Sequence, residues 1–105
     1  MQIKVSNKTE LLMQLVKNSQ RIKSLGVLRL GFFGSFVRNE ATHLSDVDFY
    51  VEFKEGGKTF DNFMDLAELL EEITGRKIEL LTPRSLSKHL GPHILKEVEY
   101  ANLAA

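Results

Sequence analysis

Two apolar segments of different pattern, the first of which ends at a glycine–serine pair, constrain the fold of this chain most. Residues 27–33 are almost all large and apolar, as in a buried strand, and Gly34-Ser35 break this run in the way a turn into a helix does. In residues 46–53, apolar and polar side chains alternate, so Asp46 and Asp48 share the face opposite the apolar one. The sequence therefore predicts two strands, of which the second presents acids on a polar face.

The rest of the chain predicts helices interleaved with strands. Asn7 and Glu10 form a capping-box pattern that opens a helix over residues 6–25, and Gly26 ends that helix. The other expected elements are, in chain order, a helix over 35–40, a loop over 41–45, a loop over 54–59, a helix capped by Asp61 and ended by Gly75, a strand over 77–82, a short helix that starts at Pro83 after Thr82, and, beyond Gly91-Pro92, a last helix over 92–101. We therefore expect an α/β (α+β) fold, with a small mixed sheet of three or more strands covered mainly on one face by helices.

Length, charge and cysteine content narrow the class of protein. At 105 residues, we expect a single domain over residues 1–105. Fourteen basic and fourteen acidic residues cancel, so general nucleic-acid binding is disfavoured. The absence of cysteine excludes disulfides, thiolate zinc sites and cysteine nucleophiles, and it fits a cytoplasmic location. No apolar run approaches the roughly 20 residues needed to span a bilayer, and the first residues lack the apolar segment of a signal peptide.

The paired acids predict a metal site. On a strand, Asp46 and Asp48 lie roughly 6.6 Å apart along one face, and their mutual repulsion favours a bound cation. Oxygen-only ligands suit Mg²⁺, which proteins usually hold through one or two carboxylates together with substrate phosphates. Glu79 interrupts the apolar pattern of residues 77–82, and it adds a third carboxylate if that strand lies beside the one that carries the two aspartates.

The glycine–serine pair predicts a phosphate cradle ahead of these acids. Gly34 lets a phosphate approach the backbone, and Ser35 adds a hydroxyl donor at the expected helix start. Arg38 lies three residues further, on the same side of that helix, and could pair with phosphate or with a site carboxylate. Together these groups could hold a triphosphate in line for attack at its α-phosphorus, while the carboxylates bind up to two metal ions.

Each of these features also has a commoner structural explanation when it stands alone. A glycine–serine pair before a helix is most often a cap, and Asp46 and Asp48 could be solvated acids. Glu79 could belong to the surface of an edge strand, and Arg38 could be a solvated helix residue. The functional interpretation depends on their joint occurrence in this order, with the acids on the polar side of an otherwise apolar strand.

The combined pattern resembles the minimal nucleotidyltransferase (MNT) family of the polymerase-β-like nucleotidyltransferase superfamily, over nearly the whole chain. The residues that carry the resemblance are Gly34, Ser35, Arg38, Ser45, Asp46, Asp48 and Glu79. The resemblance implies Mg²⁺-dependent nucleotide transfer from ATP or another NTP. In that scheme the three acids are the catalytic and metal-binding residues, and Gly34, Ser35, Arg38 and Ser45 bind the nucleotide.

The resemblance also implies a partner. Many family members are antitoxins that silence a HEPN ribonuclease toxin by attaching AMP to one of its tyrosines, and a homo-oligomer is compatible with the pattern. The sequence departs from the family at two positions. Asn39 stands where glycine is usual, although asparagine tolerates a left-handed backbone, and Glu79 stands where aspartate is common, which moves the carboxylate by about one C–C bond.

Three hypotheses follow for the function. The leading one is a nucleotidyltransferase that modifies a hydroxyl, with a tyrosine of a partner toxin as the expected acceptor. The second is an antitoxin of the same fold that neutralises its partner by contact without transferring anything. The third is a nucleotide-binding regulatory subunit.

Overall fold

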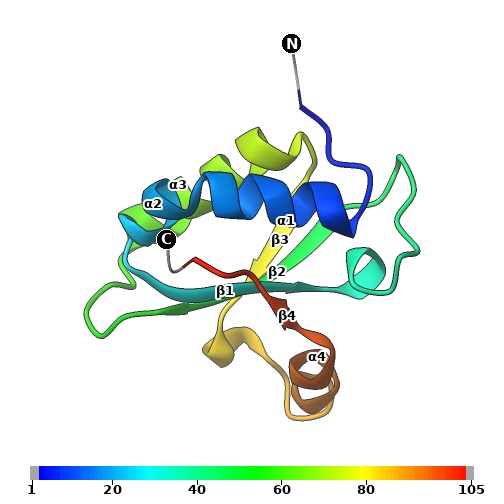
Figure 1. The fold of residues 1–105 in the computed structure, drawn as a ribbon. Coiled ribbons are helices and arrows are strands. Elements are labelled where there is room, and N and C mark those ends of the chain that lie inside the picture. The colour runs from blue at the N-terminus through cyan, green and yellow to red at the C-terminus, as the bar shows by residue number, and fades with distance from the viewer. Residues whose placement is uncertain (1–2, 104–105) are drawn as a thin grey trace.

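The computed structural model describes residues 3–103, so the ends of the expected domain over 1–105 lie outside the described range. Four strands form one mixed sheet in the order β3-β2-β1-β4 (Figure 1). β1 (Val27–Phe33) runs antiparallel to both β2 (Val47–Phe53) and β4 (Glu99–Tyr100), whereas β3 (Ile78–Leu81) runs parallel to β2. The expected mixed sheet of three or more strands is confirmed.

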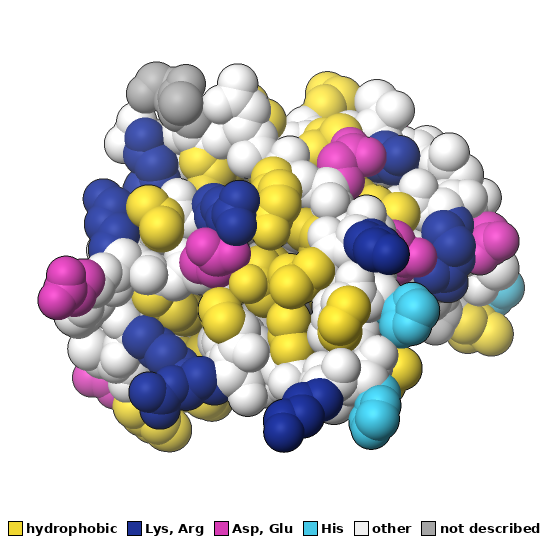
Figure 2. All heavy atoms as spheres, turned by 90° about the horizontal axis from the view of Figure 1, so that it is seen from below, with side chains coloured by type: hydrophobic (Ala, Val, Ile, Leu, Met, Phe, Trp, Pro, Cys, Tyr) yellow, Lys and Arg dark blue, Asp and Glu magenta, His cyan; other side chains and the backbone are white. Residues whose placement is uncertain are grey.

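The helices are distributed unequally over the two faces of this sheet (Figure 1). One face is covered by α1 (Lys8–Lys17), α2 (Ser19–Lys23) and α3 (Phe60–Thr74), and the shorter α4 (Gly91–Glu97) and η2 (Pro83–Ser85) lie on the opposite side. Figure 2 views that opposite side, where hydrophobic side chains gather in the middle and charged ones surround them. The core contains the fully buried side chains Val5, Leu11, Leu15, Ile22, Val27, Leu30, Phe32, Phe36, Val47, Phe49, Val51, Leu66 and Leu70.

The local sequence explains the two elements that frame the site. In β2, Val47, Phe49 and Val51 are completely buried, so the alternating pattern places Asp48 on the other face. In α3, the Thr59 side chain accepts a hydrogen bond from the backbone N–H of Asn62 and is the N-cap. The expected Asp61 cap is therefore wrong, because that residue lies within the first helical turn, whereas the expected C-terminal Gly75 is confirmed by its left-handed φ of 69°.

The expected single helix over residues 6–25 is two helices. α1 ends at Lys17 and α2 begins at Ser19, with Asn18 between them. The Asn18 side-chain Nδ2 donates to the carbonyl of Gln14 at 2.8 Å, so it competes for an acceptor that the helical backbone uses. The break lies at Asn18, whose φ of −104° and ψ of 18° leave the helical region, and the predicted cap of α1 at Asn7 is confirmed.

The C-terminal part of the chain differs most from expectation. The expected helix over 92–101 stops at Glu97, and the following residues form β4, which pairs with Gly31 of β1. Gly91-Pro92 begin α4 instead of separating the expected short helix from the last one, and the helix after Thr82 is the three-residue η2. A Cβ at Gly31 would lie 2.4 Å from Val98 Cγ1, so the missing side chain lets this segment pack on β1. Sheet pairing therefore overrides the helical pattern.

The expected helix over 35–40 is a single 3-10 turn, η1 (Gly34–Phe36). Asn39 follows it with a φ of 58°, a left-handed conformation that a right-handed helix cannot continue. Asparagine tolerates this conformation better than most residues that carry a side chain. No helix within residues 3–103 is long and apolar enough to cross a membrane.

Candidate active site

The end of β1 turns sharply against the polar face of β2. Phe33 is paired with Asp48, and Gly34 then takes a φ of +76° as η1 begins. A Cβ on Gly34 would lie only 2.3 Å from Oδ2 of Asp48. Glycine is therefore needed here both for the backbone conformation and for close contact with the carboxylate.

The acids predicted from the sequence gather at this edge of the sheet. β3 lies beside β2 and pairs Glu79 directly with Asp48, so the expected adjacency of the two strands is confirmed. Asp48 is partly buried, whereas Asp46 and Glu79 are exposed. Burial, followed by the negative charges of Glu79 and Asp46, raises the pKa of the Asp48 carboxyl above its ordinary value. The cluster is therefore electrostatically unfavourable by itself.

The donor set suits a divalent cation. Within residues 3–103, no three acidic, histidine or cysteine side chains already stand close enough together to hold a metal ion. Asp46, Asp48 and Glu79 nevertheless supply only carboxylate oxygens, which Mg²⁺ prefers, and a cation would relieve the repulsion that raises the pKa of Asp48. The role of these three acids as metal ligands stays a prediction.

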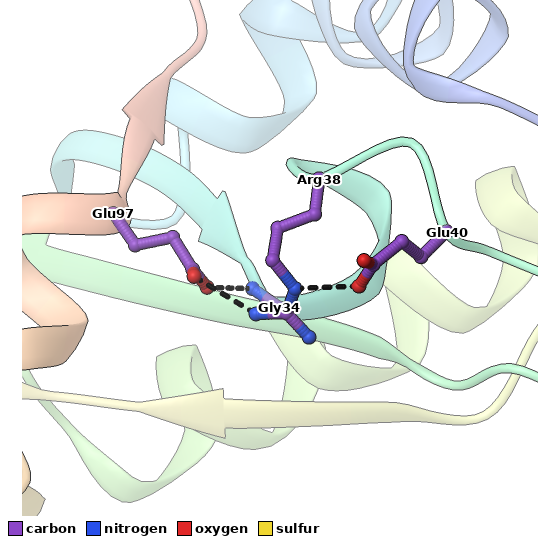
Figure 3. Close-up of polar contacts among 4 residues, drawn as sticks. All are labelled: Gly34, Arg38, Glu40 and Glu97. Atoms are coloured by element: carbon purple, nitrogen blue, oxygen red, sulfur yellow. Dashed lines mark hydrogen bonds and ion pairs between the residues drawn. The ribbon is translucent and has the colours of Figure 1, made fainter.

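Arg38 and Gly34 are both bound by a residue that the sequence did not single out (Figure 3). Glu97, at the end of α4, accepts a hydrogen bond from the Gly34 N–H at 2.5 Å and another from Nη1 of Arg38 at 2.8 Å. Nε of Arg38 donates to Glu40 at 2.7 Å. The Gly34 N–H and then Arg38 lower the pKa of the Glu97 carboxyl, while Glu40 and Glu97 raise that of Arg38. No local signal in the sequence distinguishes Glu97 from other acids of a surface helix.

The two predicted serine ligands occupy different local environments. Ser35 lies within η1, directly after Gly34, and its carbonyl accepts from the backbone N–H of Glu40 at 2.9 Å. The Ser45 hydroxyl accepts from the backbone N–H of Thr42 at 2.8 Å, which closes the loop that leads into β2. Ser45 thus has a structural role in this loop, and the nucleotide contacts of both serines stay predictions.

Arg76 is a second residue whose role the sequence analysis missed. Its side chain is buried, and it donates from Nε to the carbonyl of Val5 at 2.7 Å and from Nη1 to the carbonyls of Thr42 and Ser45 at 2.9 and 2.7 Å. Its guanidinium carbon also lies 5.0 Å from the centre of the Phe36 ring. Arg76 therefore connects β3, η1 and the loop before β2. A charged residue between a helix-ending glycine and an apolar strand was the only signal for it.

The architecture and the site together define a class of protein. A glycine turn is packed against Asp48 of β2, which pairs with Glu79 of β3. Residues 12–101 match the family model of the nucleotidyltransferase domain, and the chain therefore belongs to that family and is a nucleotidyltransferase. The membership and the fold expected from the sequence are confirmed.

Individual relatives are consistent with this assignment. The protein adenylyltransferase MntA of Thermococcus cleftensis is 40% identical over 75 residues, which cover 71% of this chain and 75% of that protein. A solved structure provisionally assigned as a minimal nucleotidyltransferase has a TM-score of 0.68 at 30% identity, over 84% of this chain and 93% of that one. A chain from the complex of tri-AMPylated HEPN toxin with MNT antitoxin, from Shewanella oneidensis, shares the fold with a TM-score of 0.51 at 23% identity, over 84% of this chain and 71% of that one.

Proposed function

We propose that this nucleotidyltransferase is a protein adenylyltransferase that transfers AMP from ATP to a hydroxyl of a partner protein and thereby acts as an antitoxin. The observation that carries the proposal is the contact between the Gly34 turn and a cluster of acids on β2 and β3. The adenylyl group is favoured because MntA of Thermococcus cleftensis is named a protein adenylyltransferase. We further propose a tyrosine of a HEPN toxin as the acceptor, because a structural neighbour contains an AMPylated toxin of that class.

The geometry suggests how the residues of this chain would divide the work. Asp46, Asp48 and Glu79 would hold Mg²⁺, which when bound neutralises phosphate charge and lowers the pKa of an attacking hydroxyl. Arg38 and the backbone N–H of Gly34 would bind the phosphates.

The proposed transfer exchanges one phosphorus–oxygen bond for another. The acceptor oxygen forms a bond to the α-phosphorus, the bond from this phosphorus to the oxygen that bridges to the β-phosphorus breaks, and pyrophosphate leaves. Glu79 would receive the hydroxyl proton, because it is exposed and lies directly opposite Asp48.

The exposure of the site favours a macromolecular acceptor. Asp46 and Glu79 are both solvent-exposed, so a side chain presented by another folded protein could reach them. A partner protein would supply its own positioning surface. The absence of cysteine and the proposed pairing with a toxin favour the cytoplasm as the compartment.

Intact-mass measurement of the partner tests the proposal. The protein encoded beside this one is incubated with this chain, Mg²⁺ and each NTP in turn, and we expect a gain equal to a whole number of AMP groups with ATP. Replacing both aspartates, as D46N with D48N, should reduce transfer by at least about 100-fold, because the phosphate charge is then no longer compensated. Asp65 is exposed on α3, on the other side of the sheet, so D65N is the matched control and should transfer normally.

Complex formation between the two proteins and ATP binding, measured beside the partner mass, separate the remaining alternatives. If the partner gains no mass with any NTP but forms a stable complex with this chain, neutralisation occurs by contact and the transfer proposal is wrong. If ATP binds with Mg²⁺ but neither modification nor a toxin complex forms, the chain is a nucleotide-binding regulatory subunit instead.

A further inference from the structure

The carboxylate of Glu97 is hydrogen-bonded to Gly34 and Arg38, the two residues that bind the nucleotide phosphates in the proposed function (Figure 3). One of its oxygens accepts the Gly34 N–H and the other accepts Nη1 of Arg38. These contacts join α4 to the turn after β1, across 63 and 59 positions of the sequence. The close-up shows the carboxylate facing both donor nitrogens, which lie next to each other.

A carboxylate and a phosphate compete directly for such donors. Both are anions that accept charge-assisted hydrogen bonds through two oxygens, and a backbone N–H has only one hydrogen to donate. Nε of Arg38 donates to Glu40 and Nη1 donates to Glu97, so both of these guanidinium nitrogens already have an acceptor. A phosphate can therefore take the Gly34 N–H and this face of Arg38 only when Glu97 leaves them.

We propose that Glu97 is a built-in competitor of the nucleotide triphosphate, which holds the phosphate-binding groups in the free protein and is displaced when the nucleotide binds. This inference rests on the proposed function, because that function places the phosphates at Gly34 and Arg38. Glu97 sets the affinity for nucleotide, since every binding event must first break its two hydrogen bonds.

The packing of α4 makes this displacement feasible. Gly91 is the only buried residue of the seven in this helix, and the Glu97 side chain retains 28% exposure. The side chain of glutamate rotates about three bonds, so it can leave the cradle for solvent while β4 stays paired with β1. Glu97 also adds negative charge beside Asp48, and this charge repels the phosphates of an incoming nucleotide.

Nucleotide affinity of Glu97 variants tests the inference. Wild type, E97Q and E97A are titrated calorimetrically with Mg²⁺·AMP-PNP, and with tripolyphosphate as a probe that lacks the base and ribose. We expect E97A to bind both probes roughly ten-fold more tightly than wild type, and E97Q to lie between them because glutamine keeps an acceptor but loses the charge.

Glu99 provides a matched control. It stands two residues further, pairs with Nζ of Lys8 at 3.0 Å and does not contact the cradle, so E99Q should bind like wild type. If E97A binds either probe more weakly than wild type does while it unfolds at the same temperature, Glu97 supports the cradle and the inference is overturned.

A second measurement uses the unmodified protein. In NMR spectra of wild type, saturating tripolyphosphate should shift the Gly34 amide and accelerate hydrogen exchange of the Val98 amide, which bonds to Ile94 at the end of α4. The same spectra should show a change in the ¹³C chemical shift of the Glu97 side-chain carboxylate. If the probe binds and this shift is unchanged, the nucleotide does not displace Glu97, and the inference fails while the proposed function stands. If neither probe binds wild type, E97Q or E97A, the proposed function itself fails and the inference fails with it.

Discussion

At Gly34 the backbone has a φ of +76°, and an added Cβ would lie 2.3 Å from Oδ2 of Asp48. The first observation concerns the backbone alone, because residues with a Cβ pay about 1–2 kcal/mol in the left-handed region. The second concerns the site, because any side chain here must move the carboxylate. Gly56 has nearly the same φ of +75° but no heavy atom within 4 Å of an added Cβ. The two glycines therefore allow the two effects to be separated.

Alanine at these two positions should have different consequences. We expect G56A to lower the free energy of unfolding by about 1 kcal/mol, and G34A to lower it by about 2–3 kcal/mol and to abolish nucleotide transfer. Urea unfolding measures the first quantity, and partner mass the second. Equal stability losses with transfer retained in G34A would show that contact with Asp48 has no role in the site.

At the scale of elements, Arg76 determines how the loop before β2 is placed. Its guanidinium donates to three backbone carbonyls, one in the segment before α1 and two in the loop before β2, and it lies on the Phe36 ring of η1. These two segments share one further hydrogen bond, from Nζ of Lys4 to the His43 carbonyl at 2.8 Å. A lysine has a single donor group on a flexible stem, so it cannot satisfy the three acceptors in this fixed geometry. The position of the loop, and of Asp46 at its end, therefore depends on a residue from the approach to β3.

This dependence predicts a distinct effect of R76K. We expect the variant to lose about 2 kcal/mol of stability, because buried carbonyls would be left without partners, and to transfer nucleotide more slowly with little change in the affinity for partner protein. Arg84 is exposed in η2, so R84K should stay within about 0.5 kcal/mol of wild type. Thermal unfolding and initial rates measure both variants, and an R76K protein as stable and active as R84K would contradict this account.

At the scale of the whole molecule, the acid cluster opposes folding stability. A carboxyl whose pKa is raised by folding binds more protons in the folded than in the unfolded state. The free energy of unfolding therefore falls as the pH rises from the ordinary pKa of aspartate through the raised pKa of Asp48. At neutral pH, ionised Asp48 lowers the stability of the metal-free protein, a cost that the site retains for its function.

Neutralising Asp48 should consequently stabilise the metal-free protein. We expect D48N to unfold at a higher temperature than wild type at pH 7 without Mg²⁺. The gain in the free energy of unfolding should be at most about 1 kcal/mol, because the carboxylate is partly solvated. The difference should vanish below about pH 4 and shrink when Mg²⁺ is added, since the metal stabilises only the wild type. D65N again provides the control, and a D48N protein less stable than wild type at pH 7 without metal would rule out electrostatic strain at this site.

Much of the fold could be read from local patterns. The alternation in β2, the cap at Asn7 and the C-terminal Gly75 of α3 were all predicted, because each depends on one segment's own backbone preference or on the period of its side chains. The same patterns identified the glycine–serine turn and the paired acids, and their order along the chain indicated a nucleotidyltransferase, which is confirmed.

The sequence by itself therefore determined which segments form β1, β2 and β3, on which face acids lie and which family the chain belongs to. Only the tertiary structure decided what binds Gly34, Arg38 and the loop before β2. Glu97 lies 63 positions from Gly34, and Arg76 lies 71 positions from Val5. The physical reason is that such contacts depend on strand pairing, which converts the end of the predicted last helix into β4 and brings Glu97 to the site, and no local period or propensity encodes that pairing.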